Sequence, residues 1–441
     1  MTSHPGASPL LDRLIGELTP YLSRRAWYVA FSGGLDSTVL LHLLAQWSRR
    51  QRLPELCAVH VHHGLQTVAR QWPAHCQRVC AGWGITLQVL DVTVTPQASV
   101  EQAARTARYA ALGQLLGDDE LLLTAQHRDD QAETVLLRLL RGAGVRGLAG
   151  MPLQRRLQAG WLVRPLLAVS REQLLAYARE QGLEWIEDPS NADGGFARNY
   201  LRNEVLAPLR SRWPQATVQL ARTAHHMREA LELLEEVATT DLQAATGTSP
   251  WPWLALPSLE VAALRRLSPA RQRNALQAWL APLTRLPDTP HWAGWDSLRD
   301  AREQACPIWR LTDGELHRSA GRLWWLPALW CTETDAGSTW DDVTQPLDLG
   351  SNGQVRWHGP VPRGRLRIGY RQGGEVLDCP GRGRRDLKRL LNEAQLPAFV
   401  RGRLPLLFDE HRLLAVANLP QWGMATGQLE WRPPTNAQRL R

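Results

Sequence analysis

The run Ser32-Gly33-Gly34-Leu35-Asp36-Ser37 combines the side chains and the backbone freedom that a pyrophosphate site needs. Its two glycines let the main chain approach an anion closely, and its serine hydroxyls can donate hydrogen bonds to phosphate oxygens. An apolar run at 27–31 precedes it, and apolar residues recur at helical spacing over 38–47, which predicts a strand, a turn and a helix. The free N–H groups that begin this helix would complete the anion site, with Asp36 as a Mg²⁺ ligand.

Two other polar clusters follow expected strands. His60-Val61-His62-His63 ends an apolar run, and its histidines could bind a metal, contact a nucleotide phosphate or act as a base. Asp130 and Glu133 lie three residues apart at the start of an expected helix, so both carboxylates would project near one another. Such a pair could bind an ammonium group or Mg²⁺, although acidic residues at a helix start also compensate the helix dipole without any further role.

Strands and helices alternate between residue 27 and about residue 141, with strands expected at 27–31, 57–61, 85–89 and 121–125. This alternation predicts an α/β fold with a doubly wound parallel sheet. Ligands of such sheets bind beyond the carboxyl ends of the strands, which is where the polar clusters lie. The elements therefore place the chemistry-bearing residues at one edge of one sheet.

The composition of the 441-residue chain narrows the chemistry further. A net charge of +8 at pH 7 favours a polyanionic partner. Lys388 is the only lysine, so neither a P-loop lysine nor a Schiff-base lysine can exist before that position. The six cysteines contain no Cys-x-x-Cys pair, which favours reduced thiols. Because the sequence lacks a long apolar stretch, we expect a cytoplasmic protein without membrane contact.

Changes in composition along the chain suggest three domains. We expect the catalytic α/β domain at 1–212, a helical domain rich in arginine and tryptophan at 213–335, and a small α+β domain at 350–435. Residues 361–403 hold eleven basic side chains against four acidic ones. Such a basic segment is typical of a surface that contacts an RNA backbone.

Together these motifs resemble the tRNA(Ile)-lysidine synthetase family of the PP-loop ATP pyrophosphatases. The resemblance extends over nearly the whole chain and implies an adenine nucleotide alpha hydrolase-like catalytic domain, followed by two tRNA-binding domains. Besides the loop at 32–37, the ordered set of matching segments comprises 62–65, 105–109, 129–134, 139–144, 164–166, 187–191, 198–199, 373–375, Lys388 and 405–408.

The resemblance implies a ligase that joins free L-lysine to C2 of the wobble cytidine in the CAU anticodon of tRNA(Ile). ATP would first adenylate the cytidine O2, and the products would be lysidine, AMP and pyrophosphate, which converts codon reading from AUG to AUA. On this chain, 32–37 would bind ATP, Asp36 would hold Mg²⁺, Asp130 and Glu133 would orient lysine, and His63 is a candidate base. A homodimer is also expected. The side chains expected to contact nucleotide or tRNA phosphates are Arg105, Arg108, Arg198, Arg202 and Lys388.

Two departures from the family pattern and two rival functions remain open. Many family members have Gly-His where this chain has Ala125-Gln126, so the role of that histidine does not transfer, and Arg128 replaces a small or apolar residue. One rival is a tRNA thiolase of the same superfamily, which would need paired or catalytic cysteines. The other is a non-catalytic, ATP-responsive RNA-binding protein. The presence of Asp36, Asp130 and Glu133 together argues against this non-catalytic function, because binding alone would not require all three carboxylates.

Overall fold

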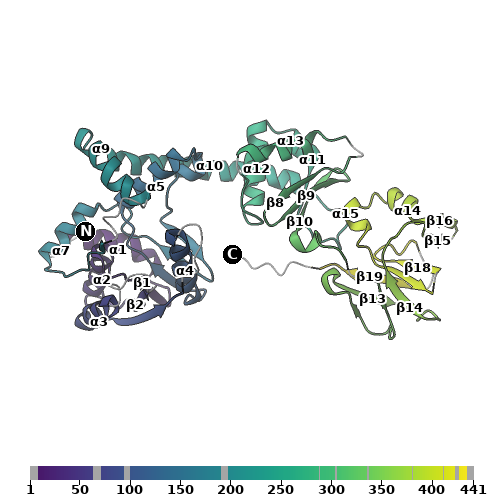
Figure 1. Ribbon diagram of the computed structural model, residues 1–441, viewed down its shortest axis with the longest axis horizontal. Helices are drawn as coiled ribbons and strands as arrows, with labels where there is room; N and C mark the ends of the chain where they lie inside the picture. The colour runs from purple at the N-terminus through teal and green to yellow at the C-terminus, as the bar shows by residue number, and fades with distance from the viewer. Residues whose placement is uncertain are drawn as a thin grey trace. The chain divides into compact units, whose positions relative to one another are not determined.

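The chain folds into two compact units, the first ending at Leu233 and the second beginning at Leu234 (Figure 1). The junction lies inside the long helix α10 (Ala216–Thr246), beyond the domain boundary expected at residue 212. Within the described ranges, none of the helices has the length and apolar character needed to cross a membrane. The computed structural model describes residues 8–62, 71–93, 100–189, 197–287, 289–302, 305–334, 337–379, 381–410, 412–422 and 427–434.

The first unit is built around a six-stranded sheet with the order β3-β2-β1-β4-β6-β5. Its strands are β1 (Ala26–Ala30), β2 (Glu55–His62), β3 (Thr86–Asp91), β4 (Glu120–Leu123), β5 (Gln154–Leu157) and β6 (Gly160–Val163). Its helices are α1 (Pro9–Leu18), α2 (Leu35–Ser48), α3 (Trp72–Trp83), α4 (Val100–Gln114), α5 (Arg128–Leu140), α6 (Val145–Leu148), α7 (Arg171–Glu180), α8 (Ala197–Tyr200) and α9 (Ala207–Arg212), with a π-helical turn η4 (Leu201–Leu206) between the last two.

The predicted parallel α/β core is confirmed, and the sheet is mixed at one edge. Strands β3, β2, β1, β4 and β6 run parallel, whereas β5 pairs antiparallel with β6. The two-residue turn between β5 and β6 begins with Gln158 at φ +49°. A tight hairpin turn of this kind needs positive φ, and it places two neighbouring strands antiparallel.

Strand β1 lies between two apolar layers. Trp27, Val29 and Phe31 belong to the core that includes α2, whereas Tyr28 and Ala30 pack on the opposite side, with the core that includes α4. This alternation follows from the period of two in a strand. Because helices cover both faces, the carboxyl end of β1 is held rigidly where the loop at 32–37 begins.

The segment expected to be a helical domain is instead mixed. It contains α11 (Val261–Arg265), α12 (Pro269–Leu280) and α13 (Ala293–Asp300), but also a four-stranded antiparallel sheet. Strand β10 is buried at every position, so its apolar run does not alternate, and periodicity cannot distinguish it from a buried helix. The strands are β7 (Ser258–Glu260), β8 (Ile308–Leu311), β9 (Gly314–Ser319) and β10 (Arg322–Pro327).

The C-terminal part of the second unit is rich in strands. Sheets with the orders β11-β14-β17-β18-β15-β16 and β12-β13-β19 share one core with residues of β10, while the expected division between 213–335 and 350–435 stays a prediction. The elements are β11 (Ser338–Thr339), β12 (Leu347–Asp348), β13 (Gln354–His358), β14 (Leu366–Gly369), β15 (Val376–Cys379), β16 (Gly383–Asp386), α14 (Leu387–Glu393), α15 (Ala398–Arg401), β17 (Leu406–Asp409), β18 (Arg412–Val416) and β19 (Gln428–Arg432).

A buried arginine joins three loops of the second unit. The Arg403 side chain donates from Nε to Asn352 Oδ1 (3.1 Å), from Nη1 to the carbonyls of Trp330 (3.1 Å) and Thr332 (2.7 Å), and from Nη2 to the carbonyl of Ser351 (3.2 Å). Asn352, which is fully buried, donates in turn to the carbonyl of Arg403. Buried carbonyls need donors, so this guanidinium satisfies groups that would otherwise be costly to bury.

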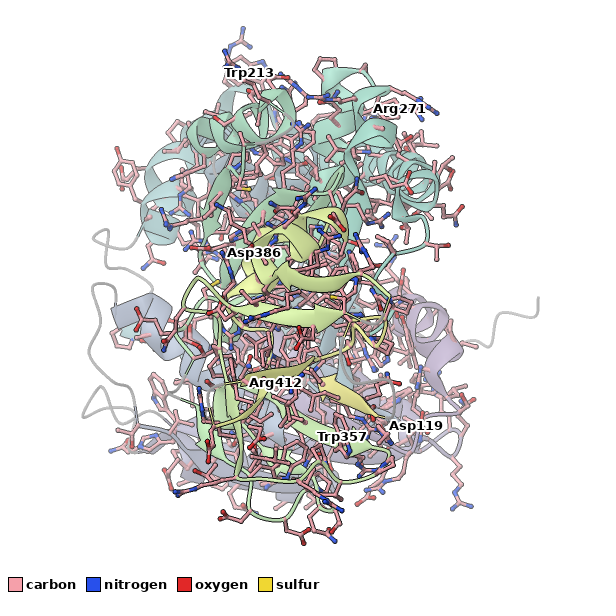
Figure 2. The ribbon with its side chains drawn as sticks, turned by 90° about the vertical axis from the view of Figure 1, so that its right-hand side faces the viewer. Asp119, Trp213, Arg271, Trp357, Asp386 and Arg412 are labelled. Carbon is pink, nitrogen blue, oxygen red and sulfur yellow. The ribbon has the colours of Figure 1, made fainter. Side chains whose placement is uncertain are left out.

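We predict that Arg403→Met lowers the free energy of unfolding of the second unit by about 3 kcal/mol or more, because several buried acceptors lose their donor at once. Urea denaturation of the full chain measures this loss. The matched control is Arg412→Met, which removes an exposed ion pair between β18 and Asp378 of β15 (2.8 Å; Arg412 is labelled in Figure 2) and should cost less than about 1 kcal/mol. Equal losses of unfolding free energy in the two variants would contradict the stabilising role assigned to Arg403.

Candidate active site

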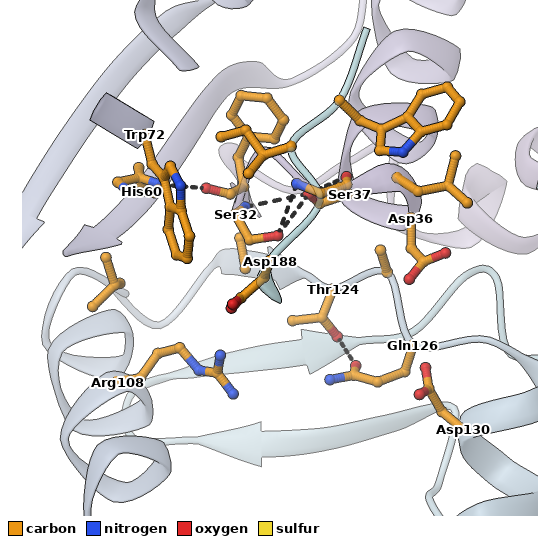
Figure 3. A pocket seen from close by; sticks show the side chains of 18 of the residues that line it. Ser32, Asp36, Ser37, His60, Trp72, Arg108, Thr124, Gln126, Asp130 and Asp188 are labelled. Carbon is orange, nitrogen blue, oxygen red and sulfur yellow. Dashed lines mark hydrogen bonds between the residues drawn. The ribbon is translucent and has the colours of Figure 1, made fainter. Parts of the chain in front are cut away.

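A cavity of about 940 Å³ opens at the carboxyl ends of β1, β2 and β4. The loop at 32–37 forms part of its wall, together with residues from α3, α4, α5 and η4 (Figure 3). This is the edge at which ligands of open α/β sheets bind, as the sequence predicted. Every residue of the expected loop except Gly33 lines the cavity.

The loop is held by its own hydroxyl groups and by one neighbouring segment. The Ser32 N–H donates to Ser37 Oγ (3.2 Å), the Ser37 hydroxyl donates to the Gly34 carbonyl (3.0 Å), and the Gly34 N–H donates to Ser32 Oγ (3.3 Å). Gly33 has φ +82°, and its carbonyl accepts from Ile186 N–H at 2.8 Å. This positive φ favours glycine, and a Cβ at Gly33 would lie 2.8 Å from Ile186 Cδ1, so that side chain would have to shift.

Helix α2 begins at this loop with Gly34 as its N-cap and, among the described residues, without a capping side chain. Its first N–H groups have no acceptor within the helix and are therefore available to an anion. Asp36 in this turn is about one-third exposed (35%), and its Oδ1 is buried without a hydrogen-bond partner. An unpartnered carboxylate oxygen beside an anion site suits Mg²⁺, which prefers oxygen ligands. Among the described residues, no group of three or more His, Cys, Asp or Glu is placed to hold a metal ion.

His127 lies among three carboxylates, and the sequence analysis assigned it no role. Its Nε2 is 3.6 Å from Asp36 Oδ2 and 3.5 Å from Asp130 Oδ2, while its Nδ1 accepts from Asp129 N–H at 3.2 Å. Burial lowers the pKa of His127, but the interaction with Asp36 and the charges of Asp130 and Asp129 outweigh it and raise the net pKa above its usual value. His127 is the N-cap of α5 and forms a capping box with Asp130, which the usual Ser/Thr signature of an N-cap does not reveal in the sequence.

The structure separates the two carboxylates that were expected to act as a pair. Asp130 lines the cavity, but Glu133 is fully buried and does not. Arg202 Nε lies 2.6 Å from Glu133 Oε1 and Arg202 Nη2 lies 3.2 Å from Oε2, whereas the same Nη2 is 3.5 Å from Asp130 Oδ1. Burial raises the pKa of Glu133, and Arg202 offsets part of this rise. Helical spacing alone does not reveal that η4 covers one member of the pair.

All four predicted phosphate-binding arginines, Arg105, Arg108, Arg198 and Arg202, line the cavity. The guanidinium carbons of Arg105 and Arg108 lie 5.1 and 5.7 Å from the ring centre of Tyr109, and Arg198 Nη2 donates to Thr134 Oγ1 at 2.9 Å. Burial lowers the pKa of Arg108; the proximity of Tyr109 raises it, and Arg105 and Arg198 lower it further. This concentration of positive charge suits an anionic ligand. Arg202 also lines the cavity, but its guanidinium is engaged by the two carboxylates.

The structure gives Gln126 a role in place of the family histidine. Its Nε2 donates to the Tyr109 hydroxyl at 3.3 Å, and its Oε1 accepts from Thr124 Oγ1. Burial raises the pKa of Tyr109, but Arg105 and other nearby arginines lower it to a net value below the usual one. Gln126 therefore holds the ring around which the cavity arginines gather.

The cavity leaves two further predicted site residues untested. His63 lies outside the described residues. Lys388 is an exposed residue of α14 in the second unit, next to the exposed strand β16 with its arginines. Their functional roles stay predictions.

The cysteines near the loop are not in a reactive state. Cys76 and Cys80 are buried free thiols, and burial raises the pKa of each to about 12. The thiolate is the nucleophilic form, so neither group is prepared for sulfur transfer. This environment disfavours the thiolase alternative.

Comparison with known proteins finds matches over most of the chain. A PP-loop domain model matches residues 9–209, a TilS substrate binding domain model 259–324, and a TilS substrate C-terminal domain model 366–430. The tRNA(Ile)-lysidine synthase of Pseudomonas putida is 60% identical over 96% of this chain and 99% of its own length. That of Pseudomonas aeruginosa is 58% identical over 98% of both chains, and that of Coxiella burnetii is 37% identical over 92% of this chain and 91% of its own.

A solved structure also aligns with part of the chain. The U34-tRNA thiolase NcsA from Methanococcus maripaludis, with its [4Fe-4S] cluster, aligns with 50% of this chain and 78% of its own. The sequence identity is 16% and the TM-score is 0.41.

We predict that a thiol reagent modifies Cys306 in the native protein at least about tenfold faster than Cys76 or Cys80, because Cys306 is exposed whereas the other two are buried with raised pKa values. Mass spectrometry after short labelling at neutral pH measures the order in which the cysteines are modified. Labelling in urea is the control, because it reports the reactivity of each thiol without the folded structure. Rapid native labelling of Cys76 or Cys80 would revive the thiolase alternative.

We also predict a pH-dependent contribution of His127 to stability. Because its pKa is raised by folding, the stabilisation is fully present below about pH 6.5 and is lost as the pH rises through the higher pKa of the folded state. The difference in free energy of unfolding between wild type and His127→Gln should therefore shrink as the pH rises from about 6 to about 9.

Urea denaturation over this pH range measures that difference. His225→Gln is the control, since the His225 side chain is 67% exposed beside Glu229 and such an exposed ion pair contributes little to stability. A difference for His127→Gln that stays constant with pH would show that the protonated ring does not stabilise the fold.

Proposed function

The chain belongs to the tRNA(Ile)-lysidine synthase family, and we propose that it joins free L-lysine to the wobble cytidine of tRNA(Ile) with a CAU anticodon, using ATP. The observation that carries this proposal is one cavity that combines a pyrophosphate loop at 32–37 with a carboxylate, Asp130, that faces the same space. A site for pyrophosphate beside a site for an ammonium group is what this ligation requires.

The first step activates a poor electrophile. The cytidine O2 attacks the α-phosphorus of ATP, the bond from that phosphorus to the bridging oxygen breaks, and pyrophosphate leaves. The N–H groups of the first turn of α2 and the hydroxyl of Ser32 would stabilise the charge that develops on the leaving group, while the Ser37 hydroxyl keeps the loop in shape by donating to the Gly34 carbonyl. The loop is already closed by its own hydrogen bonds, so little reorganisation is needed.

The second step forms the carbon–nitrogen bond. The lysine ε-amine attacks C2 of the cytidine, AMP leaves with the former O2, and the amine loses a proton. Asp130 would bind the incoming ammonium group, and Glu133 would act as a positioning residue by holding Arg202 beside Asp130. The usual pKa of this amine is about 10.4, so a carboxylate favours binding but does not deprotonate it. His63 remains the candidate base.

Asp36 would hold Mg²⁺ together with phosphate oxygens of ATP. Its buried, unpartnered Oδ1 at the start of α2 supports this role. When bound, the ion supplies positive charge that stabilises the leaving pyrophosphate.

Recognition of tRNA would use both units. Arg105, Arg108 and Arg198 would contact phosphates near the target cytidine, and the exposed arginines of β16 with Lys388 would contact the RNA backbone elsewhere. Association into a homodimer is part of this proposal.

Incorporation of labelled lysine into a tRNA(Ile) transcript with a CAU anticodon tests the function. We expect ATP-dependent transfer that fails when the wobble cytidine is replaced by uridine. Asp36→Asn should lower turnover about 100-fold or more, because it removes charge at the leaving group. The matched control is Asp119→Asn, an exposed carboxylate paired with Arg24, which should leave turnover unchanged. Pyrophosphate release without lysine transfer would indicate a different nucleophile.

A further inference from the structure

Arginine side chains gather around the ring of Tyr109, and one of them comes from outside the cavity. The guanidinium carbons of Arg105, Arg108 and Arg155 lie 5.1, 5.7 and 5.4 Å from the centre of the ring. Arg105 and Arg108 belong to α4 and line the cavity, into which Arg108 reaches in Figure 3. Arg155 belongs to β5 and lies beyond the residues that line the cavity. We call Tyr109 and these three side chains the arginine cluster.

Strand β5, the outermost strand of its sheet, directs two neighbouring arginines to opposite faces. Arg155 pairs with Leu162 of β6, which packs in the same core as Tyr109. Arg156 pairs with Trp161, and its guanidinium carbon lies 4.9 Å from the centre of the Trp161 indole. Trp161 packs with the core on the other face of the sheet. Two adjacent residues of the same type therefore differ in whether they reach the arginine cluster.

The positive charges of this region are close enough to affect one another. Burial lowers the pKa of Arg164 to about 10; Tyr109 opposes this effect, whereas Arg155 and Arg105 add to it. For Arg108, burial is again the main cause of a lowered pKa, and Arg105 lowers it further. Like charges that are held together in partly buried positions are stabilised by an anion bound among them, and guanidinium groups suit phosphate in particular.

The extent of the arginine cluster distinguishes between the anions of the reaction. ATP is a single small ligand that the cavity itself can hold. The target cytidine, in contrast, enters as one nucleotide of a longer RNA, so the phosphates of its neighbours must pass the rim of the cavity. The cluster begins at Arg105 inside the cavity and continues to Arg155 on the outermost strand. Cations that continue beyond the cavity match a polyanion.

We propose that Arg155 binds the phosphate backbone of the tRNA next to the target cytidine and so extends onto β5 the contacts that the cavity arginines begin. The proposal rests on the proposed function, which brings the wobble cytidine into this cavity. Neither the sequence motifs nor the comparisons assign a role to Arg155. Its Nη1 donates to the Arg156 carbonyl at 3.1 Å, which uses one of the five N–H donors of the guanidinium.

Binding of a tRNA(Ile) transcript with a CAU anticodon to full-length proteins, measured over a range of salt concentrations, tests this assignment. Each phosphate contact to a single strand contributes about 0.7 to the slope of log K against log salt concentration. We expect Arg155→Met and Arg155→Gln to raise the Kd for tRNA about fivefold at moderate salt and to reduce the magnitude of the slope by about 0.7. Arg155→Lys keeps the charge and should keep the wild-type slope. The same differences should appear with an RNA hairpin that contains only the anticodon stem and loop.

The matched control is Arg156→Met, because Arg156 is adjacent in β5 but lies over Trp161 on the other face. It should leave the Kd for RNA and the salt slope unchanged, and the Kd for ATP should stay unchanged in every variant.

Four results would overturn the proposal. Equal weakening of RNA binding in Arg155→Met and Arg156→Met would show a general effect of net charge. An unchanged salt slope in the two neutral Arg155 variants would show that no phosphate contact is lost. A higher Kd for ATP in these variants would assign the arginine cluster to the nucleotide. Weaker binding of whole tRNA without weaker binding of the hairpin would place the contact away from the target cytidine.

These outcomes are distinct from failure of the proposed function. If the wild-type protein bound the tRNA(Ile) transcript but transferred no lysine to it, the proposed function would fall, and the role of Arg155 beside a target cytidine would fall with it. If wild type transferred lysine and the neutral Arg155 variants bound RNA as wild type does, only the role of Arg155 would fall.

Discussion

Balance of charge around the start of α5 is the constraint on which the first unit depends. Asp129, Asp130 and Glu133 lie within five residues, and two arginines, Arg202 and Arg210, balance their charge. Arg210 lies 2.8 Å from Asp129, and Arg202 pairs with the fully buried Glu133. Removing one partner of a buried ion pair is costly, so these contacts fix η4 and α9 against the end of the sheet.

The same network decides which acidic groups remain available for chemistry. Asp129 also accepts from the N–H of Arg171 at 2.9 Å, so its carboxylate is engaged on two sides by other parts of the chain. Asp130 and Asp36 keep oxygens toward the cavity, with His127 between them. The cavity therefore offers the carboxylates of Asp36 and Asp130 together with arginine side chains, so that a ligand carrying both charges can be bound there.

In the second unit, a buried arginine is satisfied by uncharged groups. Arg403 is buried among backbone carbonyls and the Asn352 side chain, which its planar group of donors can satisfy together. A lysine ammonium has three donors at a single point and could not reach these separate acceptors. In a chain with one lysine, arginine thus serves structural roles as well as the expected contacts with anions.

Local patterns in the sequence determined the parallel α/β core, the loop at 32–37 and the residues gathered at its edge. Glycine spacing and strand alternation depend on near neighbours, which the sequence contains directly. Tertiary structure alone decided that Glu133 is buried against Arg202, that His127 joins Asp36 to Asp130, and that β10 is a strand rather than part of a helix. These outcomes depend on partners far apart in the chain, because burial and electrostatic pairing are set by packing in space and not by spacing along one helix.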